Sequence, residues 1–429
     1  MRIENATLAD GRAVDVRVED GTVEAVGDLD PVADEETVDA EGNLLLPGAI
    51  DVHVHFREPG FEHKETWETG ARSAAAGGVT TVADQPNTDP TTTDGAGFDA
   101  KAERAATSCI DYGINGGVTA DWDPDSLFER PLFALGEVFL ADSTGDMGIE
   151  ADLFSEAAAR AGEAGVPVTV HAEDADLFDE SAIEGDLGGV GRDADADAWS
   201  AYRTAEAEAV AVERAVSVGG ETGAQIHIAH TSTPEGVDAA RDGGATCEAT
   251  PHHLFLSRDD LAELGTYGRM NPPLRSEARR EAMFERLADG RIDMVATDHA
   301  PHTREEKEQS LLDAPSGVPG VETMVPLLLG AVVAGDLTAE RVRDVVAANP
   351  AEVFDLPRKG RVEAGADADL ALYDLNAARE IRGADLHSNC EWTPFEGHTG
   401  VFPEWTMLRG EFVWDGEGFG EVAGENVRD

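Results

Sequence analysis

The sequence predicts an α/β protein: a (β/α)8 barrel with a small β-domain built from both termini. Residues 1–48 are short alternating runs such as VDVRVEDGTVEAVG, separated by acidic residues and glycines, which is typical of strands joined by hairpins. From Gly48 onward β-rich runs alternate with stretches rich in Ala, Glu and Arg, and after Asn349 short β runs return. Such alternation indicates parallel βα units, and their number suits a barrel of about 250 residues or more.

The clearest βα units also set the expected division of the chain. Their β-rich segments are VTTVAD, VPVTVHAED and IDMVATDH, and the helical stretches that follow are FDAKAERAAT, TAEAEAVAVERAVSVGG and ETMVPLLLGAVVAG. We expect residues 1–48 and 351–429 to supply the two parts of the β-domain, the second ending in a tail. Residues 49–350 are expected to form the barrel.

The charge of the chain indicates a saline environment and excludes one class of partner. Its 87 acidic and 32 basic residues give a formal net charge of −55. Molar salt shortens the Debye length to roughly 3 Å and screens the repulsion within such a surface. We therefore predict a halophilic protein. Nucleic acid is excluded as a partner, because a phosphate backbone needs a basic surface.

Cysteine usage and the apolar runs favour a cytoplasmic globular protein. The three cysteines are odd in number and far apart, so we expect reduced thiols and not a disulfide framework. The longest nearly apolar run, Met324 to Gly335, is too short to cross a bilayer, and the start MRIENATLAD lacks the apolar core of a signal peptide. We expect no membrane partner.

A pair of histidines is the strongest chemical signal. His53 and His55 follow the apolar run LLLPGAI in the segment DVHVH. On a strand, residues i and i+2 point to the same side, so both imidazoles can face one metal ion. Neutral imidazole suits zinc, although two polar residues on an exposed strand face would show the same spacing.

Further polar side chains stand in or at the ends of predicted strands: Glu137, His171, His230 and Asp298. In a βα barrel the C-terminal strand ends gather on one rim, where active sites lie, so these residues are expected to converge. His227 competes with His230, and we favour His230 because it lies nearer the end of its strand. We assign no direct role to His63, His252 or His253.

The motifs DVHVHFREPG, DQPNTDP, HAED, AHTST, MNPPLR, ATDHAPH and GVPGVET, in this order across nearly the whole chain, resemble the dihydroorotase family of amidohydrolases. The resemblance implies a distorted barrel with two divalent metals, usually zinc, and a β-sandwich made from the two termini. It also implies reversible hydrolysis of L-dihydroorotate to N-carbamoyl-L-aspartate, a step of de novo pyrimidine synthesis.

Carried onto this chain, the resemblance implies that His53, His55 and Asp298 hold one metal and that His171 and His230 hold the other. Asp298 would also be the catalytic proton carrier. The implied substrate contacts are Arg57, Asn87 and His302 for the carboxylate, and Asn271 with the Ser316-Gly317 backbone for the ring amides. The planar guanidinium of Arg57 suits a carboxylate, although a surface charge would be the ordinary reading of an arginine.

The bridge between the two metals departs from a common pattern. Many amidohydrolases use a carbamylated lysine, but no lysine occurs between Lys101 and Lys307. Alignment of GEVFLADSTG with the similar lysine-containing segments puts Glu137 at that place. Some dihydroorotases use an aspartate a few residues further on, so Asp142 is the rival bridge.

Two other functions compete with this interpretation. An allantoinase or hydantoinase would share the metal ligands, but allantoinase-like sequences usually have Asn where this chain has Arg57. A catalytically inactive scaffold paralogue is disfavoured because the metal-ligand set is complete. We expect a small-molecule substrate and, since symmetric pairs are the commonest assembly of soluble enzymes, a homodimer.

Overall fold

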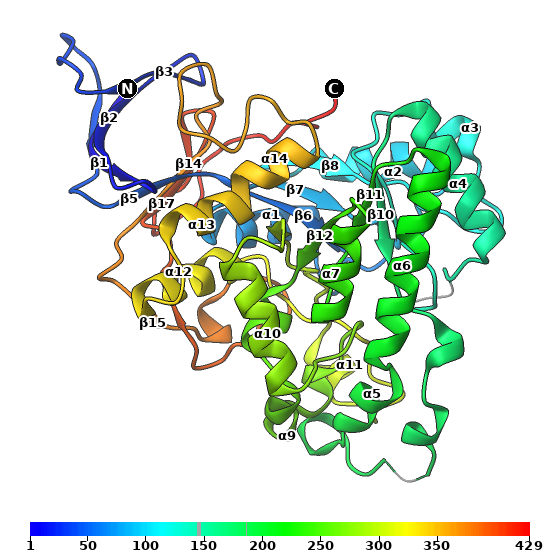
Figure 1. Cartoon of the computed structure of the whole chain (residues 1–429). Helices are drawn as coiled ribbons and strands as arrows, with labels where there is room; N and C mark the ends of the chain where they lie inside the picture. The colour runs from blue at the N-terminus through cyan, green and yellow to red at the C-terminus, as the bar shows by residue number, and fades with distance from the viewer. Residues whose placement is uncertain (144–146, 186) are drawn as a thin grey trace.

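The computed structural model describes residues 1–143, 147–185 and 187–429. Figure 1 shows the N-terminal strands at one side of the molecule and the helices of the middle of the chain wrapped around a central set of strands. The predicted α/β fold class is confirmed, and its two parts are described in turn.

Parallel strands form the barrel. One sheet holds β6 (Ala49–Val54), β7 (Val79–Asp84) and β8 (Asp111–Ile114), and a second holds β9 (Leu135–Phe139), β10 (Val168–His171), β11 (Ile226–Ile228), β12 (Thr246–Ala249) and β13 (Met294–Val295). Isolated parallel bridges join the two sheets at both edges, Gly116 to Leu135 and Val54 to His299. Within the described residues, eight strands therefore close into a barrel that is distorted at two seams.

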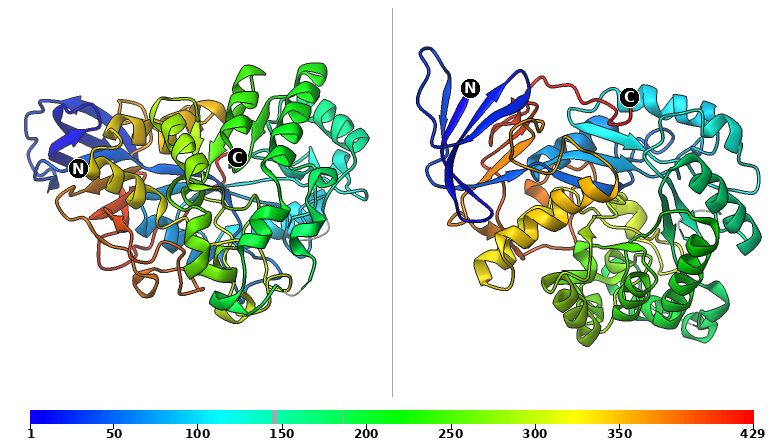
Figure 2. Two further views of the ribbon diagram at one scale, coloured as in Figure 1. Left: turned by 60° about the horizontal axis from the view of Figure 1, so that its bottom comes forward. Right: turned by 45° about the horizontal axis from the view of Figure 1, so that its top comes forward.

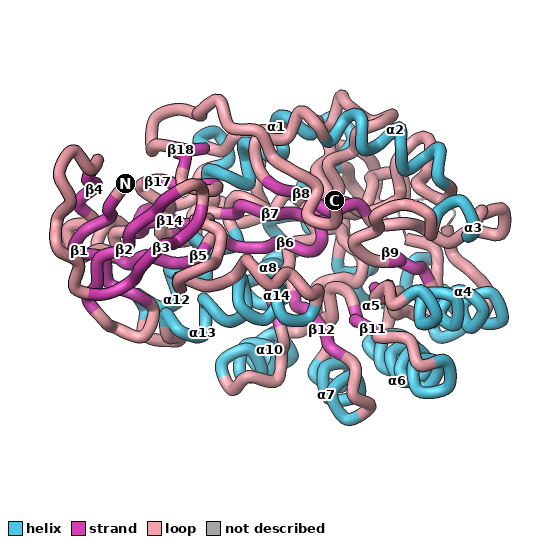
Figure 3. Tube along the Cα trace, turned by 90° about the horizontal axis from the view of Figure 1, so that it is seen from above, coloured by secondary structure: helices cyan, strands magenta, loops and turns pink. Residues whose placement is uncertain are grey.

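Helices cover the outside of the barrel, as Figure 3 shows for α4, α6, α7 and α10. The longer ones are α1 (Trp67–Ala76), α2 (Gly95–Ala105), α4 (Ala151–Ala164), α6 (Ala205–Thr222), α7 (Pro234–Asp242), α10 (Glu277–Ala288) and α12 (Met324–Ala334). Helix α6 begins where the Thr204 hydroxyl accepts from the N–H of Ala207, and it ends at Gly223 in the left-handed conformation. It buries a stripe of small residues, Ala207, Ala211 and Ala215, at helical spacing.

Short helices occupy the connections: α3 (Pro124–Leu127), α5 (Asp197–Tyr202), α8 (Pro251–Phe255), α9 (Leu261–Leu264), α11 (Arg304–Lys307), α13 (Ala339–Arg343) and α14 (Asn349–Val353). Helix α5 belongs to the long connection between β10 and α6. This connection lies on the side of the barrel where the strands have their C-terminal ends. None of the helices described is long and apolar enough to cross a membrane.

The two ends of the chain share one curved sheet. It contains β1 (Arg2–Leu8), β2 (Ala13–Glu19), β3 (Thr22–Gly27), β4 (Thr37–Asp39) and β5 (Leu44–Pro47) from the start, and β14 (Leu370–Tyr373), β17 (Trp405–Leu408) and β18 (Glu411–Trp414) from the end. Antiparallel pairing of β5 with β14 joins the two halves. The sheet is strongly curved, and the N–H of Val23 on β3 donates to Ala366 O near the start of β14. The two halves of the sheet therefore face each other across one core, as the layers of a sandwich do.

The C-terminal segment returns from this sheet to the barrel, as Figure 2 shows. The N–H of Tyr112 on β8 donates to Glu425 O, and the N–H of Val427 donates to Tyr112 O. A small hairpin of β15 (Arg379–Glu380) and β16 (Thr399–Gly400) packs against α12. The last residues of the chain are thus tied to β8.

Candidate active site

A pocket opens at the C-terminal ends of the barrel strands. Its lining includes most residues that the sequence predicted: His55, Arg57, Asn87, Glu137, His171, His230, Asn271, Asp298, Ser316 and Gly317, together with Phe139, Ser143 and Ala300. These residues come from seven or more separate segments of the chain and meet because parallel strands end on one rim.

The first polar group contains His53, His55 and Asp298. His53 lies in β6 and His55 directly after it, and the Nε2 atoms of both approach Asp298 Oδ1, at 3.6 and 2.9 Å. All three side chains are buried. In the described part of the chain, His53 Nε2 makes no hydrogen bond although it is fully enclosed, which is the condition expected of a nitrogen that faces a metal ion.

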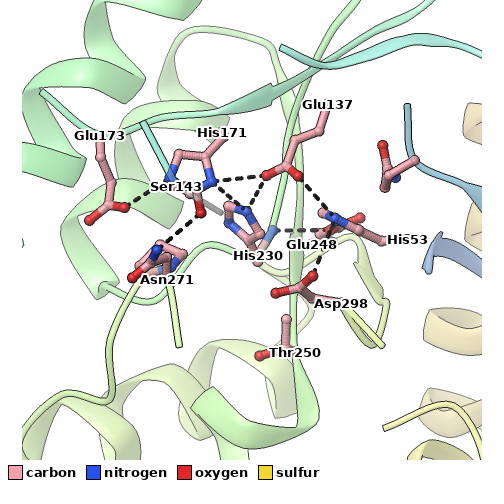
Figure 4. A network of polar contacts seen from close by, with 12 residues as sticks. His53, Glu137, Ser143, His171, Glu173, His230, Glu248, Thr250, Asn271 and Asp298 are labelled. Atoms are coloured by element: carbon pink, nitrogen blue, oxygen red, sulfur yellow. Dashed lines mark hydrogen bonds and ion pairs between the residues drawn. The ribbon is translucent and has the colours of Figure 1, made fainter. Parts of the chain in front are cut away.

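The second polar group contains Glu137, His171 and His230. Glu137 Oε1 lies 2.9 Å from His171 Nδ1 and 2.5 Å from His230 Nε2, and these two nitrogens are 3.0 Å apart. Figure 4 shows Glu137 with these histidines on one side and His53 on the other. Its second oxygen, Oε2, lies 3.4 Å from His53 Nε2, so Glu137 reaches both groups.

The donor set fits divalent metal ions. Ligand atoms of His53, Glu137 and His230 lie within 4.8 Å of one another, and so do those of His53, His55 and Asp298. Several imidazole nitrogens and two carboxylates in a buried group are the ligands that zinc and similar cations prefer. The chain therefore holds groups able to bind metal, with Glu137 between them.

The two carboxylates carry charge in this buried place. Burial opposes ionisation of Glu137, but the charges of His230 and His53 and the hydrogen bonds from the histidines outweigh it and hold its pKa well below the ordinary value. For Asp298 burial again opposes ionisation, and the hydrogen bond from His55 with the nearby imidazoles lowers the pKa. Both side chains are thus anionic.

Outer carboxylates that we did not predict orient the histidines. Glu248 on β12 places Oε1 2.6 Å from His53 Nδ1 and also accepts from the backbone N–H of His230 at 3.0 Å. Glu173 places Oε2 2.9 Å from His171 Nε2 and is clamped by Arg203. Such partners fix the ring orientation of metal-binding histidines. Glu173 stands in the HAED motif, so its role as a partner of His171 could have been predicted from the sequence. No sequence motif around Glu248 indicated its contact with His53.

Backbone strain marks the same residues. Arg57, His230 and Asp298 have φ values of 66°, 33° and 47°, which non-glycine residues rarely adopt. Each such residue costs roughly 1–3 kcal/mol and persists where the surrounding structure enforces it, commonly at active sites. Gly317, at φ 126°, could not carry a side chain, because a Cβ there would lie 2.7 Å from Ala300.

Arg57 occupies one wall of the pocket with an unbalanced charge. Its Nε donates to Pro301 O at 3.3 Å, and the residue is 4% exposed. Burial lowers its pKa to about 10, so the guanidinium remains charged at neutral pH. Among the described residues no carboxylate oxygen lies within 4 Å of it, and a buried charge without a counter-ion is costly.

His302 stands behind Arg57 and does not line the pocket. Its Nε2 lies 2.9 Å from Ser316 O and 3.2 Å from Nη2 of Arg57, and its Nδ1 lies 3.2 Å from Lys64 Nζ. Burial and the charges of Arg57 and Lys64 hold its pKa well below the ordinary value. His302 is therefore a neutral imidazole with both nitrogens engaged by the protein.

The other predicted substrate contacts lie around the pocket. Asn87 Oδ1 is 2.7 Å from His55 Nδ1, so this oxygen orients a histidine and leaves the amide nitrogen for another contact. Asn271 accepts from Trp199 and donates to Ser143 Oγ at 3.1 Å. Figure 4 shows Asn271 and Ser143 beside His171, at the side of the pocket away from Asp298.

The rival and unassigned residues lie elsewhere. Asp142 is exposed and accepts from the N–H of Gly148 at 2.7 Å, apart from the two histidine groups. His227 is buried with Nε2 3.0 Å from Glu248 Oε2. His253 bonds Thr250 and Pro272 O, His252 packs against its ring, and His63 is exposed.

Comparison with known proteins identifies the relatives of this chain. A family model described as "Amidohydrolase family" matches residues 44–400. A curated dihydroorotase of Halobacterium salinarum is 67% identical over 428 residues, covering 99% of both chains. Dihydroorotases of Methanosarcina acetivorans and Bacillus licheniformis are 44% and 37% identical, covering 94% and 93% of this chain and 89% and 94% of theirs.

Solved structures of the same architecture include the L-hydantoinase (dihydropyrimidinase) of Arthrobacter aurescens, with a TM-score of 0.92 at 28% identity over 99% of this chain and 98% of that one. The D-hydantoinase of a Bacillus sp. AR9 has a TM-score of 0.89 at 25% identity over 100% and 98%. Because the family model spans most of the chain and curated relatives match nearly its whole length, the protein belongs to the amidohydrolase family and, within it, to the dihydroorotases.

Proposed function

We propose that the protein hydrolyses L-dihydroorotate reversibly to N-carbamoyl-L-aspartate. The observation that carries this proposal is the buried Arg57 guanidinium, which lines the pocket beside His55 and Asp298 and lacks a carboxylate partner among the described residues. Dihydroorotate bears a carboxylate next to its cyclic amide, and that anion would complete the ion pair. In the closing direction the reaction would serve de novo pyrimidine synthesis.

The proposed metal ligands divide into two sets that share one residue. His53, His55 and Asp298 would hold one ion, His171 and His230 the other, and Glu137 would touch both, as its two oxygens face the two sets. When bound, zinc would lower the pKa of a water molecule to near 7, and a divalent cation would polarise a carbonyl. We propose zinc as the native metal.

The remaining steps belong to side chains of this chain. We propose that Asp298 takes the proton of the attacking water and delivers it to the departing ring nitrogen, since its carboxylate is ionised and lines the pocket. Arg57 and the amide nitrogen of Asn87 would bind the substrate carboxylate. His302 would support the carboxylate-binding side of the pocket through its contact with the Ser316 carbonyl. Asn271 and the Ser316-Gly317 backbone would contact the ring amides.

A hydantoinase activity is the second candidate, because the hydantoinase structures share the fold at TM-scores of 0.92 and 0.89. A hydantoin ring carries no carboxylate of its own, so it would leave Arg57 without a partner. The buried charge therefore favours dihydroorotate. We further propose that the protein works in the cytoplasm and as a homodimer, the commonest closed assembly.

The test combines metal analysis with parallel assays. We expect purified protein to contain two divalent ions per chain and to turn over dihydroorotate far faster than hydantoin or allantoin at equal concentration. Removal of metal by a chelator should abolish turnover, and adding zinc should restore it. Faster turnover of hydantoin would replace the proposal with the second candidate, and a protein with no metal and no turnover would contradict both.

A further inference from the structure

The side-chain amide of Asn271 is held in one orientation by a tryptophan. The indole Nε1–H of Trp199 donates to Asn271 Oδ1 at 2.9 Å and shares its hydrogen with Met270 O at 3.2 Å. Indole nitrogen is a donor only, so the amide group that faces it must be the oxygen. The amide nitrogen of Asn271 is thereby turned to the other side, where it donates to Ser143 Oγ at 3.1 Å.

Trp199 is itself fixed by its surroundings. The guanidinium of Arg269 lies 3.9 Å from the centre of the indole ring, which is the geometry of a cation–π contact. Arg269 in turn donates to Leu311 O at 2.6 Å. Trp199 is 7% exposed and Asn271 5% exposed, so water does not compete well for the hydrogen bond between them.

Trp199 lies in the short helix α5, and this helix also contacts residues on the side of the pocket where His171 lies. Arg203 follows α5, lies 5.8 Å from the Trp199 ring and donates to Glu173 Oε2, the outer partner of His171. The position of α5 is therefore set by contacts on both sides of the pocket. Trp199 does not line the pocket, and its direct hydrogen bond to a lining residue is the one to Asn271.

We propose that Trp199 is a specificity-determining positioning residue that makes Asn271 a hydrogen-bond donor toward the pocket. The site then selects a ligand that presents a carbonyl oxygen at this place, and it disfavours one that presents an N–H there. The inference rests on the proposed function in so far as Asn271 contacts the ring amides. It adds the direction of that contact, donor from protein to ring oxygen, and the residue that sets it.

The test is a mutant cycle on dihydroorotate turnover. Trp199→Phe keeps an aromatic ring but removes the N–H, and we expect KM to rise about fivefold with little change in kcat. In an Asn271→Ala background the same change should alter KM less than about twofold, because its effect passes through Asn271. Trp405→Phe in the terminal sheet is the matched control, with KM unchanged.

A polarity test completes the design. Asn271→Asp keeps the acceptor for Trp199 but replaces the NH₂ donors, so KM should rise at least as much as in Trp199→Phe. Melting temperature and metal content are measured for each variant, to separate an effect on Asn271 from loss of the fold.

Three results would overturn the inference: an unchanged KM in Trp199→Phe, an equal effect in the Asn271→Ala background, or a wild-type KM in Asn271→Asp. If the wild-type protein turns over hydantoin and not dihydroorotate, the proposed function fails. The cycle is then measured on hydantoin, whose ring carbonyls offer the same acceptor, so the two failures remain distinct.

Discussion

Nδ1 of His53 lies 2.6 Å from Oε1 of Glu248, and this contact turns the other ring nitrogen of His53 toward Glu137 and Asp298. The two residues are separated by 195 positions in the chain and meet because β6 and β12 belong to one barrel. The orientation of the His53 ring thus depends on a carboxylate outside the pocket lining.

Glu248→Gln should weaken metal binding without unfolding the barrel. The amide keeps the shape but loses the charge that orients His53, and loss of such a partner typically costs 10–100-fold in metal affinity, as an order of magnitude. Competition with a chelator followed by metal analysis measures this. Glu322→Gln is the matched control, because Glu322 is also a buried glutamate on a histidine, His387, outside the pocket. Equal metal retention in both variants would contradict the assignment.

Arg57→Met should damage recognition of the substrate carboxylate and leave metal content unchanged. A buried charged pair is lost, so kcat/KM should fall by the equivalent of roughly 2–5 kcal/mol. Steady-state kinetics on dihydroorotate and metal analysis of the same preparation check this. Near wild-type kinetics would remove the main support for the dihydroorotase activity.

Asp298→Asn should abolish turnover while the barrel remains folded, since one carboxylate is assigned both metal ligation and proton transfer. Substrate binding should survive in part, because Arg57 and Asn87 are untouched. Calorimetry with dihydroorotate, circular dichroism and metal analysis separate these effects. A variant that keeps tenths of the native rate with normal metal content would show that another group carries the proton.

Glu137→Gln should lose metal and activity, whereas Asp142→Asn should keep both. Glu137 reaches both histidine groups, and Asp142 is exposed and bonds the N–H of Gly148. Activity should not depend on bicarbonate, because no lysine lies between Lys101 and Lys307 to be carbamylated. Metal counts per chain decide between the two acids: full metal in Glu137→Gln with loss in Asp142→Asn would make Asp142 the bridge.

Stability should require high salt. The chain has four lysines, of which Lys101, Lys307 and Lys359 are buried and Lys64 is partly buried against Glu306, so lysine adds little positive charge to the surface. The net charge of −55 repels itself when unscreened. Melting temperature should rise steadily from low to molar KCl, and sucrose at equal viscosity should not replace the salt. A flat profile would refute the halophilic prediction.

The fold class and the family could be predicted from the amino-acid sequence alone, because both depend on patterns among residues close together in the sequence. Alternation of β-rich and helical runs is a short-range property, and the placement of His53 and His55 two residues apart follows from strand geometry. Strand ends of parallel βα units gather on one rim whatever their exact packing, so the convergence of His171, His230 and Asp298 could be expected before any coordinates.

Only the tertiary structure decided the partners across strands. No local pattern links Glu248 to His53, Trp199 to Asn271, or Lys64 to His302, since each pair is far apart in sequence and meets through packing. Alignment offered both Glu137 and Asp142, and only the tertiary structure shows that Glu137 lies against both histidine groups while Asp142 is exposed. The direction and burial of each side chain depend on how the strands close into a barrel, and a pattern along the sequence carries no information about that packing.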